Sequence, residues 1–192
     1  MIERTSSSTW VRGVVEMFAA EGVDTTALLR EAGIERTALD DPTQRISIDE
    51  VSLLWELAVA HSGKPTLGLN RELAAAYGKF GVVGHAMMAC PTLLAALERM
   101  RRYLKVISSA ATFELRDAPQ GCWFEFGHAG GERPVPRQRS EFGVLSMLCF
   151  CSWITGRELS AVAVELVGPH PGDASAHERA FGCPVRFGQL AN

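Results

Sequence analysis

The feature that most constrains the fold is the stretch from Phe142 to Ile154, in which almost every residue is apolar. It lies inside segment 137–155, which we predict to be a helix. A helix that is hydrophobic on all sides must be buried or must meet a partner. No apolar run in the chain reaches the roughly 20 residues that cross a bilayer. The rest of the chain must therefore supply the elements that enclose this helix.

Apolar side chains at helical spacing predict helices through most of the first 110 residues. Ser47 and Glu50 form a capping box, in which each side chain can bond the other residue's backbone amide. The segment after Pro91 and Thr92 is the most regular, because its apolar residues fall on one face. The predicted helices cover residues 9–21, 25–32, 48–62, 66–76, 80–89 and 92–107.

Strand patterns begin after residue 111. Residues 112–116 and 122–126 alternate polar and apolar side chains around a turn rich in Pro and Gly, which predicts a β-hairpin. The segments that follow are a loop at 129–136, the helix at 137–155, a strand at 161–167, a short helix at 174–181 and a strand at 183–187. We predict an α+β fold with a mostly helical N-terminal part, followed by a small antiparallel sheet packed on long helices.

Composition limits the function. The 192 residues fit one domain, residues 1–192, and 47% of them are hydrophobic, enough for a core without disulfides or metal. A net charge of -3 argues against DNA binding by this domain itself, because a DNA reader must neutralise phosphates. Five cysteines and no signal-peptide pattern predict reduced thiols and a cytoplasmic protein with no membrane contact.

The predicted hairpin carries the clearest chemical hint. With the turn between Asp117 and Cys122, Glu114 lies opposite Glu125 and Arg116 lies opposite Trp123, all on the face away from the core. Paired carboxylates across a sheet repel unless they are solvated, bridged by an arginine or bound to a cation. Beside Trp123, whose ring can face an ammonium group, they suggest a site for a basic amino acid or amine. A solvated outer face is the alternative.

Three further residues are candidates for ligand contact. Arg102 can offer a planar bidentate donor to a carboxylate, although the basic run around it also suits a solvated helix face. Glu141 is a charge at the edge of the apolar helix and needs a partner, unless it caps the first helical turn. His85 has apolar neighbours, which favours a core histidine over a ligand contact.

Catalytic and metal signatures are weak. The sequence has no G-x-S-x-G, P-loop or G-x-G-x-x-G pattern, and its five histidines lack zinc spacing. Cys149 and Cys151 would point about 200° apart on a helix, so buried inert thiols are favoured over chelation. We therefore predict no cofactor, no metal and no enzymatic activity, with a small-molecule enzyme or carrier as the alternative.

Several segments together resemble the arabinose-binding-type N-terminal domain of AraC-family transcription regulators. The resemblance lies in their order and spacing rather than in any one motif. It includes the ornithine-utilisation type of regulator, and the stretch at 181–187 carries the most weight. The matching stretches are ALLREAGI at 27–34, LWELA at 54–58, SGKPTLGL at 62–69, FGVVGHA at 80–86, CPTLLAAL at 90–97 and FGCPVRF at 181–187.

This resemblance implies a sensor that binds a small-molecule effector and forms a homodimer. DNA would be bound only by a C-terminal helix-turn-helix domain, which we expect to lie outside these residues. Dimerisation would use the surface of helix 92–107 or of helix 137–155. A dimerisation module that binds no ligand remains a further alternative.

Overall fold

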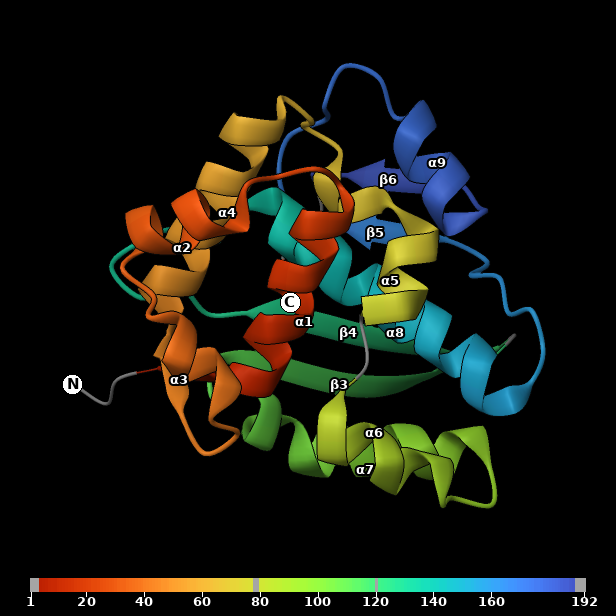
Figure 1. Ribbon diagram of the computed structural model, residues 1–192. Helices are drawn as coiled ribbons and strands as arrows, with labels where there is room; N and C mark the ends of the chain where they lie inside the picture. Colours follow the sequence, from red (N-terminus) through yellow and green to blue (C-terminus); the bar gives the residue numbers. More distant parts are fainter. Residues whose placement is uncertain (1–3, 78–79, 120, 189–192) are drawn as a thin grey trace.

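A computed structural model describes residues 4–77, 80–119 and 121–188. Helices form most of it, and three two-stranded sheets complete it (Figure 1). The helices are α1 (Ser8–Ala20), α2 (Thr25–Ala32), α3 (Arg36–Asp40), α4 (Ile48–Ser62), the 3-10 turn η1 (Leu67–Leu69), α5 (Arg71–Tyr77), α6 (Gly81–Met88), α7 (Leu93–Ile107), α8 (Arg137–Thr155) and α9 (Ser175–Phe181). The strands are β1 (Thr5–Ser7), β2 (Arg45–Ser47), β3 (Ala111–Ala118), β4 (Gly121–His128), β5 (Val164–Leu166) and β6 (Val185–Phe187).

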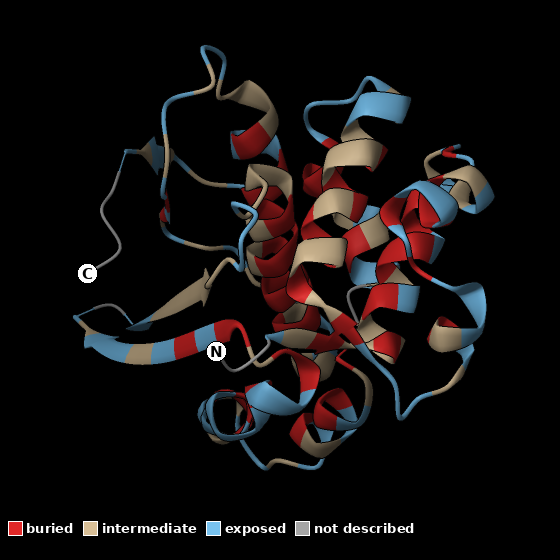
Figure 2. Cartoon of the chain, turned by 90° about the vertical axis from the view of Figure 1, so that its left-hand side faces the viewer, coloured by how far each residue is buried: buried red, intermediate tan, exposed pale blue. Residues whose placement is uncertain are grey.

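The apolar helix α8 is the centre of the molecule. It packs against η1, α4, α5, α7 and β4, and its residues Leu145 and Met147 are completely buried. Figure 2 shows a helix of mostly buried residues inside the molecule. Around it α1 and α4 contribute Phe18 and Trp55, whose rings meet edge to face 4.8 Å apart. The expectation that the Phe142–Ile154 stretch is enclosed is confirmed, with Trp153 as an exposed exception near its C-terminal end.

A second apolar cluster lies beneath the hairpin, where α7 packs against β3 and α6 packs against α7 (Figure 1). Trp10 of α1 joins the two clusters. Its ring stacks on Phe80 at 5.2 Å and meets Phe142 of α8 at 5.9 Å. The two clusters are therefore parts of one continuous core.

The β3–β4 hairpin has the predicted register, with Glu114 opposite Glu125 and Arg116 opposite Trp123. The start of β3 is buried, the end of β4 is half-buried, and the tip is exposed (Figure 2). The α+β class is confirmed, and the later strands differ from the hairpin because β5 and β6 pair in parallel. That arrangement requires the crossover that α9 supplies.

Strand β1 and its partner β2 were not predicted from the sequence. The backbone amide of Thr5 donates to Ser109 Oγ at 2.8 Å, and Ser6 Oγ bonds Ser108 Oγ at 3.1 Å. Arg4 donates to the Gly130 carbonyl at 2.7 Å. The N-terminal strand thus joins β2 to the end of α7 and to the loop after β4.

Candidate functional site

A groove of about 960 Å³ opens between α6, α7 and β3. Its apolar side comes from α6 and from Tyr103 and Val106 of α7, and its charged side comes from the same helix α7 and from β3. Exposed apolar side chains at such a site are unusual enough to suggest a ligand or a partner surface. The residues around it are Val82, Val83, Ala86, Ala95, Glu98, Arg99, Arg101, Arg102, Tyr103, Val106 and Glu114.

The arginines of this groove differ in their partners. Arg101 pairs with Glu98 at 2.9 Å and lies 3.9 Å from Glu114, and Arg99 donates to the Ala86 carbonyl at 3.0 Å. Within the described residues, Arg102 makes no hydrogen bond or ion pair. Arg102 is therefore the guanidinium in this groove that remains available to an anionic group.

The exposed face of the hairpin holds the predicted constellation. Arg116 pairs with Glu125 at 2.6 Å, and Trp123 is 41% exposed. Since Glu114 has Arg101 nearby, each carboxylate of the Glu114–Glu125 pair has its own arginine. These ion pairs remove the need for a bound cation, and they leave the face equally suited to solvent.

Two other predicted residues lie apart from this face. His85 is exposed, and its Nδ1 lies 2.9 Å from the Gly81 carbonyl, so the interpretation as a core histidine was wrong. Helix α6 is short and also exposes apolar residues such as Val82 and Met88, so a histidine with apolar neighbours in sequence can still point to solvent.

Glu141 is 1% exposed and lies between α8 and α9. Its Oε1 is 2.6 Å from His177 Nε2 and 3.1 Å from Arg137 Nε. The expectation that it needs a partner is met within the protein, by side chains rather than by the backbone of the first turn. Its other oxygen, Oε2, is buried with no hydrogen-bond partner.

Sequence reasoning missed a buried polar group beneath the loop that joins β4 to α8. Arg139 is 5% exposed, and its Nη1 donates to Ser52 Oγ of α4 at 3.2 Å. Burial lowers the pKa of Arg139 to about 10, and burial together with the Arg139 charge lowers the pKa of His128 to about 3. An arginine three residues before the apolar stretch was the available signal, but exposed arginines are common at such positions.

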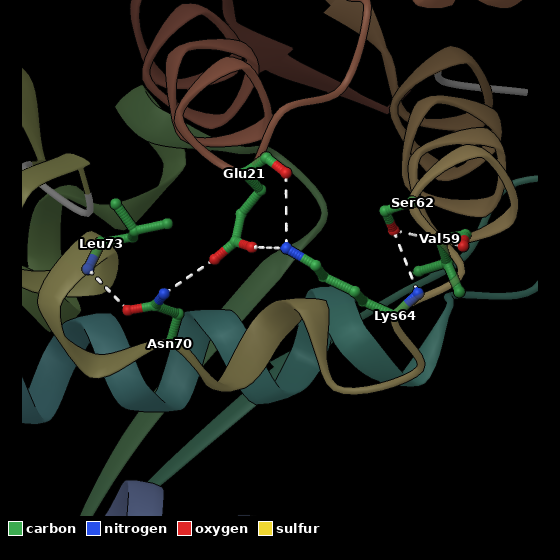
Figure 3. Close-up of polar contacts among 6 residues, drawn as sticks. All are labelled: Glu21, Val59, Ser62, Lys64, Asn70 and Leu73. Carbon is green, nitrogen blue, oxygen red and sulfur yellow. Dashed lines mark hydrogen bonds and ion pairs between the residues drawn. The ribbon is translucent and has the colours of Figure 1, made fainter.

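A second hollow, of about 350 Å³, lies beside η1, α5 and α9. Its central carboxylate, Glu21, accepts hydrogen bonds from Lys64 and Asn70, and these polar side chains point toward one another (Figure 3). The hydrogen bond from Lys64 is the main cause that lowers the pKa of Glu21. This network satisfies its own charges and joins the end of α1 to the α4–α5 connection.

The cysteines agree with the prediction of reduced thiols. The five cysteines are free, and Cys149 and Cys151 are buried. Burial raises the pKa of Cys151 to about 12. In the described parts of the chain, no three His, Cys, Asp or Glu side chains gather as a metal would need, and no helix is long and apolar enough to cross a membrane.

Comparisons with known proteins all indicate the same kind of protein. Residues 22–192 match the family model described as the arabinose-binding domain of AraC transcription regulator, N-term. The chain is 24% identical to the "Ornithine utilization regulator" of Pseudomonas aeruginosa, over 94% of this chain and 53% of that protein. It is 25% identical to the "HTH-type transcriptional regulator VirS" of Mycobacterium tuberculosis, over 92% of this chain and 53% of that protein. The chain thus spans about half the length of these relatives.

Proposed function

Because this chain belongs to the AraC family of transcription regulators, as its arabinose-binding-type N-terminal domain, we propose that it senses a small effector and controls DNA binding by a helix-turn-helix half. Its relatives are named as transcription regulators, which supports regulation over catalysis. Such a regulator would work in the cytoplasm. An effector controls the outcome only if its affinity differs between two arrangements of the protein.

We propose a basic amino acid or a related amine as the effector. The observation that carries this proposal is that Arg102 and Glu114 line the same groove. The unpaired Arg102 guanidinium would bind the effector's carboxylate, and Glu114 would bind its ammonium group. Trp123 and Glu125 on the adjoining hairpin face would contact the side-chain amine. The name of the P. aeruginosa relative, which refers to ornithine, supports the same class.

Dimerisation would use α7 rather than α8. Most of α8 is buried inside the domain and is not available to a partner. On α7, Leu94, Tyr103 and Val106 are exposed by 59%, 44% and 49%. A homodimer that contacts through α7 would place the effector groove near its interface, so effector binding could shift the dimer arrangement and the spacing of two DNA-binding halves.

The test is a thermal-shift screen of the 192-residue chain against amino acids, polyamines, sugars and fatty acids. An effector at a hundredfold excess over its dissociation constant adds about 2.7 kcal/mol of stability. A basic amino acid should stabilise the wild type, and Glu114→Gln or Glu125→Gln should weaken its binding without unfolding the domain. Glu16→Gln, on the exposed face of α1, is the matched control. Affinity unchanged in both hairpin variants would contradict the proposed site.

Experiments on the same 192-residue chain distinguish two other functions from effector sensing. A dimerisation module without ligand is favoured by the exposed apolar rim of the groove, where Val82 is 72% exposed. It predicts no hit in the screen together with a dimer in analytical ultracentrifugation. An enzyme would convert the bound compound over many turnovers, whereas a sensor returns it unchanged.

A further inference from the structure

The side chain of Arg139 is buried without a negative partner. It is 5% exposed, and among the described residues its hydrogen-bond partner is the uncharged hydroxyl of Ser52, 3.2 Å from Nη1. No Asp, Glu or chain terminus of the described parts lies within 4.0 Å of its nitrogens. Removing a guanidinium from water without a counter-charge is costly, so such a group is kept where an anion can compensate it.

A second polar group beside Arg139 is also incomplete. His128 is the last residue of β4, and its Nδ1 is buried with no hydrogen-bond partner. Burial of the ring, together with the charge of Arg139, lowers the pKa of His128 to about 3 and so keeps the imidazole neutral near pH 7. A neutral imidazole with Nδ1 protonated can donate one hydrogen bond from that nitrogen. The cluster thus has a net charge of one positive unit and spare donors on two side chains.

We propose that Arg139 and His128 form a buried receptor for one carboxylate group, separate from the α6–α7 groove. A guanidinium presents two parallel donors that match the two oxygens of a carboxylate. One carboxylate balances the single positive charge of the cluster, whereas a phosphate dianion would leave an excess negative charge buried. The His128 ring lies 4.8 Å from the ring of Phe126, and a Cβ atom at Gly143, one turn after Arg139 on α8, would lie 3.3 Å from His128 Cε1. These distances place His128 against the same part of α8 as Arg139.

Access would be through the loop at 129–136, which connects His128 to α8. Ala129 bonds the Ala110 carbonyl at the buried base of the hairpin, and the attachments after it are on the surface. The Asp49 carboxylate accepts hydrogen bonds from the backbone amides of Glu132 and Arg133, at 3.1 and 2.8 Å. Arg133 also pairs with Glu56 at 3.1 Å, and both side chains are more than one-third exposed. Exposed ion pairs of this kind are weak, so the loop can open while the core on its two sides stays folded.

The experiment measures the melting temperature of the 192-residue chain at pH 7.5 in sodium acetate, sodium phosphate and sodium chloride of equal ionic strength. Acetate should raise it relative to chloride, and phosphate should raise it less. Arg139→Met should abolish the acetate effect and should not lower stability in chloride, since it removes an unpaired buried charge. Arg133→Met, on the exposed side of the loop, should keep the acetate effect.

Three outcomes overturn the proposal. They are no acetate effect in the wild type, the same acetate effect in Arg139→Met, or a larger effect of phosphate than of acetate. If Arg139→Met does not fold, His128→Phe decides, and its acetate dissociation constant should rise about tenfold, as expected when a charged acceptor loses one hydrogen bond. Glu114→Gln should leave the acetate effect intact, so failure of the groove proposal and failure of this one are distinguishable.

Discussion

Gly68 is the position at which the packing of η1 against α8 can be tested most directly. A Cβ atom at residue 68 would lie 2.2 Å from the carbonyl oxygen of Gln138 and 3.0 Å from its carbonyl carbon. Close carbon–oxygen contacts in proteins are normally about 3.3–3.6 Å, so η1 and the first turn of α8 must separate by roughly 1 Å. Both contacting groups are backbone, and no side-chain rotation can relieve the overlap.

The expected cost of Gly68→Ala follows from these distances. Overpacking of a buried site costs about 1–3 kcal/mol, and a backbone clash belongs at the upper end of that range. Restriction of the unfolded chain by alanine returns about 0.4–1 kcal/mol. The net loss should be about 2 kcal/mol, which lowers the melting temperature of a domain of this size by roughly 4–8 °C.

Urea unfolding followed by circular dichroism measures this loss. Gly63→Ala is the control, because Gly63 has a φ of 64° and nothing within 4 Å of the added carbon. In that variant the left-handed backbone is the sole source of strain, and its net cost after restriction of the unfolded chain is about 1 kcal/mol. A Gly68→Ala protein within about 0.5 kcal/mol of the wild type, or one more stable than Gly63→Ala, would refute the reasoning.

Three other predictions concern buried polar groups. His128 stays neutral in the folded protein because its pKa is lowered to about 3, whereas in the unfolded chain it takes up a proton below pH 6.5. The contribution of neutral His128 to the free energy of unfolding is therefore complete above pH 6.5 and falls by about 1.4 kcal/mol per pH unit below pH 6.5. Urea unfolding of the wild type and of His128→Phe at pH 7.5 and 5 should show a smaller loss of stability in the variant. An equal loss in the two proteins would contradict the prediction. Glu141→Leu should cost about 1–3 kcal/mol by leaving the buried His177 ring without its hydrogen-bond partner, and adding His177→Leu should recover part of the loss; a double variant less stable than the single one would count against this. In a thiol-labelling assay the exposed Cys122 should react in the native state and Cys151 only on unfolding, since burial raises the pKa of Cys151 to about 12; equal rates would be the contrary result.

Elements with a long periodic pattern could be predicted from the sequence. Helix α7 has one apolar stripe, and the hairpin register followed from alternation about a single turn. Strands β1 and β2 have three residues each, which is too short for any alternation to be visible. Their pairing depends on residues 40 positions apart, and only the folded chain brings these together.

The candidate site divides in the same way. Glu114, Trp123 and Glu125 share a face because local strand geometry requires it, so the sequence was sufficient to group them. Arg139 and His128 come near each other because α8 packs against β4, and Ser52 of α4 bonds Arg139 from 87 positions earlier. Nothing in the local pattern distinguishes this arginine from a surface residue, since its burial is set entirely by tertiary contacts.

The hydrogen bonds of Arg4 and of strand β1 also affect the order in which the chain can fold during synthesis. Residues 4–6 bond to partners 102, 104 and 126 positions later, so they stay without these partners until the hairpin has left the ribosome. Trp10 of α1 and Trp55 of α4 meanwhile lack the ring of Phe142 that contacts both, because α8 is synthesised later still. Contacts of such long range slow folding. Fragments that end before residue 130 should therefore aggregate rather than form a smaller stable domain, and expression of this protein should depend on chaperones that hold the early helices.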